Sequence, residues 1–145
     1  MRNSTSYFSW ICLIFLTLLL LPGCGPRMVP VSGTVKIKND SAAGKLQGYG
    51  VMLEQAEPGA DGKRLSATGE IDAAGKFVLG THRGNDGAYP GKYRVAITPS
   101  SEFTEGVVPP TVIDRKYYSL ETSGLEATVE TKATEFSWEL DPAGK

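Results

Sequence analysis

The segment Val31-Ser32-Gly33-Thr34-Val35-Lys36-Ile37 alternates between apolar or small residues and polar residues. Successive side chains of a β-strand point to opposite faces, so this alternation predicts a strand with one buried and one solvated face. The odd-numbered residues would line a core, and the even-numbered ones, Lys36 among them, would face water. Such a strand is typical of an antiparallel sheet that packs on one side.

The same alternation recurs in six further segments, which predicts seven strands in all. Their expected inward residues are Tyr49, Val51 and Leu53; Leu65, Ala67, Gly69 and Ile71; Phe77 and Leu79; Tyr93, Val95 and Ile97; Leu125, Ala127 and Val129; and Phe136, Trp138 and Leu140. Residues that favour turns separate the segments, and the 17 Gly and 9 Pro of the chain favour short strands over helices. We therefore expect one all-β domain at 31–141, a seven-strand antiparallel β-sandwich.

The last two strands are expected to form a hairpin around a short turn at Lys132-Ala133. The pairs would be Val129 with Phe136, Ala127 with Trp138, and Leu125 with Leu140, all on the core side. This register would align four carboxylates on the outer face, those of Glu126, Glu130, Glu135 and Glu139. We expect a solvated acidic stripe, which Lys36 and Lys38 could partly neutralise. The alternative is a weak patch for a divalent cation or a basic partner.

The residues expected to be most deeply buried are Phe77, Tyr93, Val95, Phe136 and Trp138.

Residues 1–23 have the features of a secretion signal. Arg2 supplies a positive charge, and Trp10 to Leu21 is apolar except for Thr17, a length that suits a signal and is short for a membrane span. Leu21-Pro22-Gly23-Cys24 follows, and it resembles the lipobox of bacterial lipoproteins, with Leu three positions before the cysteine and a small residue directly before it. The resemblance implies a diacylglyceryl thioether on Cys24, cleavage before Cys24, and attachment to a membrane through acyl chains.

Cysteine usage agrees with this interpretation. The chain has two cysteines, and Cys12 lies inside the apolar part of the signal, so Cys24 alone would remain after cleavage. A free thiol in an oxidising envelope is reactive, whereas a lipidated one is not. We therefore expect Cys24 and a short tether at 24–30 to hold the domain in the bacterial cell envelope; the sequence does not indicate which leaflet.

Two turns carry a family resemblance. Asp72-Ala73-Ala74-Gly75-Lys76-Phe77 and Pro90-Gly91-Lys92-Tyr93-Arg94-Val95 resemble paired signatures of carboxypeptidase regulatory-like domains, which are transthyretin-like seven-strand sandwiches. In the first turn Asp72 can cap the backbone and Gly75 can take a positive φ. From about Val31 to Leu140 the chain also resembles small lipoproteins of planctomycete bacteria, including Ile113, Lys116 and Tyr117 of an Ile-Pro-x-Lys-Tyr segment, in which Asp114 replaces the proline. The resemblance implies a fold and no established activity.

The inventory of reactive side chains excludes several classes of function. Lys and Arg number 15 against 16 Asp and Glu, which argues against a nucleic-acid partner. His82 is the single histidine, so neither a catalytic triad nor a zinc site is expected, and no cofactor is implied. The loop His82 to Gly87 offers Asn85 and Asp86 oxygens but lacks the spacing of a calcium loop. We expect a protein that is not an enzyme.

The long connection from Pro99 to Gly124 carries the aromatic residues Phe103, Tyr117 and Tyr118. Long connections in compact domains are often functional, so these rings are a possible binding surface for a sugar or a protein. The alternative is that Ile113, Tyr117 and Leu120 pack a helical turn over the edge of the sandwich. We expect a lipid-anchored envelope protein with a structural or binding module whose partner is an envelope protein or a polysaccharide. The rival function is a carbohydrate-binding module.

Overall fold

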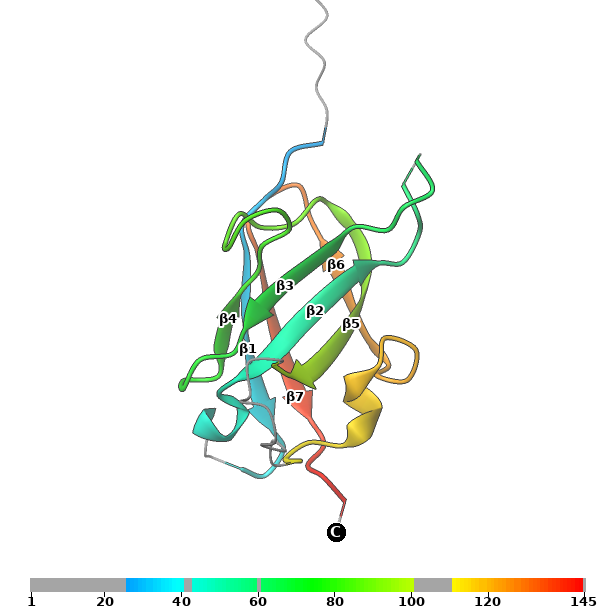
Figure 1. Cartoon of the computed structure of the whole chain (residues 1–145). Helices are drawn as coiled ribbons and strands as arrows, with labels where there is room; N and C mark the ends of the chain where they lie inside the picture. Colours follow the sequence, from blue (N-terminus) through cyan, green and yellow to red (C-terminus); the bar gives the residue numbers. More distant parts are fainter. Residues whose placement is uncertain (1–25, 41–42, 60, 101–110, 145) are drawn as a thin grey trace, which may run out of the picture.

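Seven strands and two single-turn 3-10 helices make up the regular structure of the described residues. The computed structural model describes residues 26–40, 43–59, 61–100 and 111–144 (Figure 1). The strands are β1 (Val31–Ile37), β2 (Tyr49–Gln55), β3 (Ser66–Glu70), β4 (Lys76–Val78), β5 (Gly91–Pro99), β6 (Leu125–Val129) and β7 (Thr134–Leu140), and the helices are η2 (Ala43–Leu46) and η3 (Arg115–Tyr118). Each predicted alternating segment forms a strand, which confirms the all-β class.

The strands form two sheets, one of three strands in the order β4-β1-β7 and one of four in the order β3-β2-β5-β6. Every pair is antiparallel except β1 and β7, which run parallel along their whole length from Val31↔Thr134 to Ile37↔Leu140. The prediction of a wholly antiparallel arrangement is therefore wrong at this pair. The reason is that the chain leaves β6 in one sheet and enters β7 in the other, in the direction of β1.

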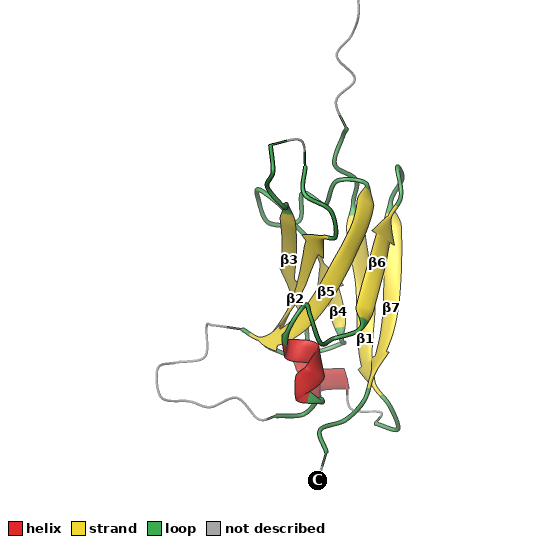
Figure 2. Ribbon diagram, turned by 90° about the vertical axis from the view of Figure 1, so that its right-hand side faces the viewer, coloured by secondary structure: helices red, strands yellow, loops and turns green. Residues whose placement is uncertain are grey.

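One core cluster draws its side chains from the inner faces of both sheets, which Figure 2 shows on edge. The strand β1 has the burial pattern that its sequence predicts, with Val31, Val35 and Ile37 buried and Lys36 exposed. The inward residues of β2 and β5 are also buried, including Tyr93 and Val95. The period-two pattern thus predicts correctly which face of each central strand meets the core.

The predicted hairpin of β6 and β7 is wrong, because the two strands belong to different sheets. The strand β6 pairs with β5, with Ala127 opposite Tyr93, and β7 pairs with β1, with Trp138 opposite Val35. The turn at 130–133 crosses between the sheets, where the Thr134 hydroxyl accepts a hydrogen bond from the backbone N–H of Glu130 (3.2 Å). Both strands still direct their apolar residues into the core, so alternation alone cannot distinguish the two arrangements.

The prediction of deep burial is confirmed for Phe77, Tyr93 and Val95 and is wrong for Phe136 and Trp138, which are half-buried. The physical reason is that β7 is an edge strand, so its inward side chains are covered on one side by β1 and lie open on the other. Leu140, at the end of β7, is fully buried.

Candidate functional site

The residues of the lipidation motif, Leu21, Pro22, Gly23 and Cys24, and the aromatic residue Phe103 lie outside the described residues. The described chain begins at Pro26, just before β1, at one end of the molecule (Figure 1). Among the described residues, no helix has the length and apolar character needed to cross a membrane.

The turn that connects β3 to β4 has the predicted geometry. The Asp72 carboxylate accepts hydrogen bonds from the backbone N–H groups of Ala74 and Lys76, both at 2.8 Å, and Gly75 adopts a φ of 76°. The carboxylate therefore replaces backbone partners that the tight turn leaves unpaired, and the left-handed conformation suits glycine. This arrangement delivers Phe77 to the core, where it is 2 % exposed.

The connection after residue 110 packs against the body of the protein. Ile113 and Tyr117 are buried, and Tyr117 lies in the short helix η3, as the packing alternative predicts. Tyr118 is half-buried, and its hydroxyl lies 3.2 Å from the Tyr49 hydroxyl. Tyr117 and Tyr118 thus present no exposed row of rings.

Asp141, directly after β7, lies at the centre of a charged cluster that the sequence analysis missed. Its carboxylate accepts hydrogen bonds from Lys38 Nζ (2.6 Å), Lys116 Nζ (2.5 Å) and the Tyr117 hydroxyl (2.9 Å). These bonds, that from Lys116 first, hold the pKa of Asp141 well below its usual range, and the same contacts raise the pKa of Lys38 and of Lys116. Because Lys38 is 103 positions from Asp141 in the sequence, no local motif signals the cluster.

This cluster, which we call the Asp141 clamp, joins the ends of β1 and β7 to η3. At neutral pH the Asp141 carboxylate is ionised, and both of its oxygens accept hydrogen bonds from Lys38, Lys116 or Tyr117. It is therefore not placed to act as a general base or as a nucleophile. The two amines stay protonated at neutral pH, because their pKa values are raised. The clamp is therefore a structural device that fastens three distant parts of the chain.

The loop between β4 and β5 is also organised by one carboxylate. Asp86 accepts hydrogen bonds from the backbone N–H groups of Thr81 (2.7 Å) and Arg83 (2.9 Å), and weaker ones from His82. Although desolvation opposes it, these backbone bonds lower the pKa of Asp86. The oxygens that a calcium ion would need are thus already bonded to the loop itself, which favours the interpretation of a plain connector.

The four glutamates of the predicted acidic stripe are distributed over two sheets and a turn. Glu126 is exposed on β6, where Arg94 is its register partner, and Glu130 in the following turn forms an ion pair with Lys132 (3.1 Å). Glu135 and Glu139 are exposed on β7, where Glu139 lies opposite Lys36. Within the part of the chain that the structure describes, no three metal-binding side chains come together.

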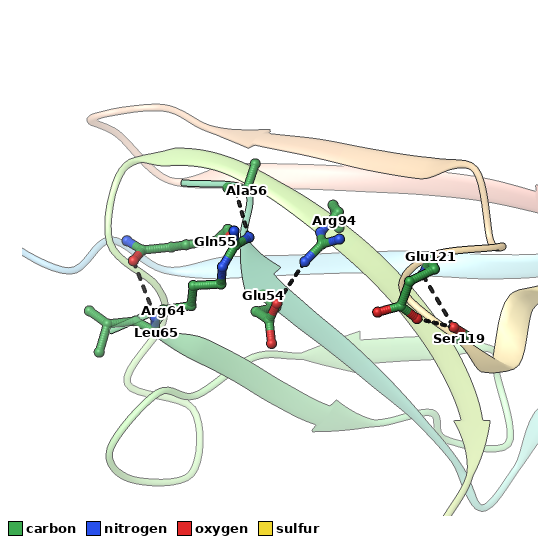
Figure 3. A network of polar contacts seen from close by, with 8 residues as sticks. All are labelled: Glu54, Gln55, Ala56, Arg64, Leu65, Arg94, Ser119 and Glu121. Carbon is green, nitrogen blue, oxygen red and sulfur yellow. Dashed lines mark hydrogen bonds and ion pairs between the residues drawn. The ribbon is translucent and has the colours of Figure 1, made fainter. Parts of the chain in front are cut away.

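Polar contacts lie at the end of β2, between β2 and β5, and in the loop that follows η3 (Figure 3). Arg94 on β5 donates from Nη2 to Glu54 Oε1 at 2.9 Å, while Arg64 donates to the backbone carbonyls of Gln55 (3.1 Å) and Ala56 (2.6 Å). Arg94 Nε is buried and makes no hydrogen bond. Nearby, Ser119 donates to the Glu121 carboxylate, and this bond lowers the pKa of Glu121. The guanidinium of Arg94 is thus paired with the carboxylate of Glu54.

Half-buried aromatic rings line the side of the molecule where β7 ends the three-stranded sheet. The Trp138 ring stacks with the buried ring of Phe77 (5.4 Å between centroids, 2° between planes) and with that of Phe136 (5.2 Å and 8°). Phe77 contacts the backbone of β1 at Gly33, where an added Cβ would lie 2.6 Å from Phe77 Cζ. The absence of a side chain at Gly33 therefore makes room for the stack, and the edge of β7 next to it is the strongest candidate for a binding surface.

No known protein family and no curated protein matches this chain.

Proposed function

We propose that this chain is a lipid-anchored protein of the bacterial cell envelope, whose β domain is a non-catalytic structural or binding module. The observation that carries the proposal is the order of the sequence: an apolar signal, then Leu21-Pro22-Gly23-Cys24, then six residues before the first strand. The tether is shorter than these six residues, because Val29 is buried and pairs with Ala88. Acyl chains on Cys24 would hold the module close to the membrane surface. Its partner would be an envelope protein or a polysaccharide.

The chemistry of the described residues supports a module without catalysis. The carboxylates with the most extensive bonding, Asp72, Asp86 and Asp141, are each engaged by backbone N–H groups or by lysines. Carboxylates bound in this way hold turns and strand ends in place.

We further propose that the two sheets form a transthyretin-like sandwich of the carboxypeptidase regulatory-like kind. The turn at Asp72 and the start of β5 at Gly91 belong to the two segments that resemble the family signatures, and Phe77 and Tyr93, which follow them, are buried. The parallel pairing of β1 with β7 is part of this proposal, because it brings the two ends of the module into one sheet.

The alternative of a carbohydrate-binding module is favoured by one feature, the stacked rings of Phe136 and Trp138 at an open edge. Sugars bind to aromatic rings through a free ring face. The Trp138 ring already stacks with the rings of Phe77 and Phe136, which weakens this alternative.

The lipid anchor is tested by replacing Cys24 with Ser in the full chain and measuring fatty-acid labelling and membrane fractionation. We expect C24S to lose the label and to leave the membrane fraction as a mature protein. The matched control is C12S, which removes the other cysteine and should remain labelled and bound to membranes. Labelling of C24S at the level of the unmodified chain would contradict the proposal.

A further inference from the structure

The backbone of β7 has one edge that is bonded and one that is free. Thr134 donates its N–H to the carbonyl of Pro30 (3.0 Å), and the Leu140 carbonyl accepts from the N–H of Lys38 (2.8 Å), so both residues bond toward β1. In a parallel pair, alternate residues of a strand make both their bonds to the same neighbour. The N–H and C=O groups of the intervening residues, Glu135, Ser137 and Glu139, therefore point away from β1.

Within the described part of the chain, no backbone group bonds to this edge of β7, because β6 pairs with β5. The opposite side of the molecule is different. There a two-way backbone bridge between Thr68 and Gly80 (2.9 Å in each direction) ties the four-stranded sheet to the chain that follows β4. One side of the two-sheet structure is thus fastened. At β7 the backbone groups of Glu135, Ser137 and Glu139 stay open to an added strand, up to Asp141, whose carbonyl accepts from the N–H of Asp114 (3.1 Å).

The side chains along this edge have two distinct chemistries. On the inner side, Phe136 and Trp138 are half-buried and offer apolar surface. On the outer side, Glu135, Ser137 and Glu139 are exposed. A strand added here would place alternate side chains against the rings and against the carboxylates. The edge therefore favours a segment that alternates apolar and basic residues.

A second copy of β7 is a poor occupant of this edge. An antiparallel pair centred on Ser137 would place Glu135 of each copy opposite Glu139 of the other. Like charges directly opposite each other destabilise a strand pair. The same glutamates that discourage self-association attract a basic partner, so charge selects the occupant.

We propose that the free edge of β7 binds, by strand addition, an extended segment of a partner protein in which basic and apolar residues alternate. The inference rests on the proposed function as a binding module and names the class of its partner. It does not depend on the lipid anchor, since the edge belongs to the folded domain.

The probe is a synthetic nine-residue peptide that alternates Lys and Val, titrated into the full chain in neutral detergent micelles. Two peptides serve as comparisons: one that alternates Glu and Val, and one that alternates Lys and Pro, which keeps the charge but cannot pair as a strand. Affinity is measured by fluorescence anisotropy, and the site by amide chemical shifts. We expect the Lys-Val peptide to bind about tenfold more tightly than either comparison and to shift the amides of Glu135, Ser137 and Glu139.

Two variants place the site. Ser137→Pro removes an N–H from the free edge without removing a bond to β1, and it should abolish binding. If Ser137→Pro perturbs the fold, Glu135→Lys provides the second test. Glu135 lies opposite the uncharged Ser32, so reversing the charge at position 135 should shift the binding preference toward the Glu-Val peptide. The matched control, Glu57→Lys, makes the same charge change after β2 and should leave the preference unchanged.

Several results would overturn the proposal: no binding, equal binding of the Lys-Val and Lys-Pro peptides, amide shifts on another strand, or a chain that dimerises through β7. None of these results would affect the test of the lipid anchor, which measures acylation of Cys24. Loss of the anchor with retained peptide binding would, conversely, reject the lipoprotein proposal alone.

Discussion

At the scale of single residues, Gly33 shows how one missing side chain shapes the core. It lies between Phe77 of β4 and Phe136 of β7 in the register of the three-stranded sheet. A Cβ at this position would meet the Phe136 carbonyl oxygen as well as the end of the Phe77 ring, 2.6 Å away. Glycine is required here by close approach and not by an unusual backbone angle.

We predict that Gly33→Ala destabilises the protein by roughly 1–3 kcal/mol or more, because the Phe77 ring and the backbone of β7 must both move. The measurement is the free energy of unfolding in urea. The matched control is Gly84→Ala, since an added Cβ at Gly84 meets no atom within 4 Å; its effect should stay within about 0.5 kcal/mol. Equal stability of G33A and the unmodified protein would mean that the stack does not lie on β1.

At the scale of elements, the edge strands β4 and β7 differ in how well they are covered. Phe77 of β4 is 2 % exposed, whereas Trp138 of β7 is half-buried although its ring is larger. The cost of truncating an aromatic side chain follows the apolar area it has removed from water. Coverage of the strand, and not ring size, should therefore determine the cost.

We predict that Phe77→Ala costs about 3–5 kcal/mol and that Trp138→Ala costs less, because truncation at its partly exposed site leaves a smaller closed cavity. Urea unfolding of the two variants, followed by far-ultraviolet circular dichroism, measures both values. A larger cost for W138A than for F77A would show that the side of the molecule at β7 is closed, which would also remove the basis for strand addition there.

The elements also show what the sequence predicts and what it leaves open. Alternation gives the existence of a strand and its buried face, because side-chain direction is a local property of the backbone. It does not give the neighbour, so β6 and β7 could be joined as a hairpin or separated into two sheets with the same inward residues. The turn at Asp72 was predictable because all of its contacts lie within four residues. The free edge of β7 was not, because it depends on the non-local pairing with β1.

At the scale of the whole molecule, the Asp141 clamp connects parts of the chain that are far apart in sequence. Asp141 follows β7, Lys38 follows β1, and Lys116 lies in η3. Tyr117 adds a reciprocal bond, since its hydroxyl accepts from the backbone N–H of Asp141 (3.1 Å). The Asp141 clamp thus lies at the end of the molecule opposite Pro26 and holds β1 and β7 in their parallel register.

The pH dependence of stability follows from the direction of the pKa shift of Asp141. Its pKa is lower in the folded protein than in the unfolded chain, so the folded state binds fewer protons in the acid range. The stabilisation is therefore fully present above the ordinary carboxyl pKa of about 4 and is lost as the pH falls below it. The two lysines have raised pKa values, so their contribution is lost only at alkaline pH, above about 10.4.

We predict that Asp141→Asn lowers the melting temperature at pH 7 and that the difference from the unmodified protein narrows as the pH falls from about 4 toward 2, because the unfolded chain then takes up a proton at Asp141 that the folded protein does not. Differential scanning calorimetry from pH 2 to pH 8 measures this convergence. Glu135→Gln removes an exposed carboxylate of β7 and is the control; its curve should run parallel to that of the unmodified protein. A gap between D141N and the unmodified protein that stays constant across this range would show that the ion pairs with Lys38 and Lys116 add nothing to stability.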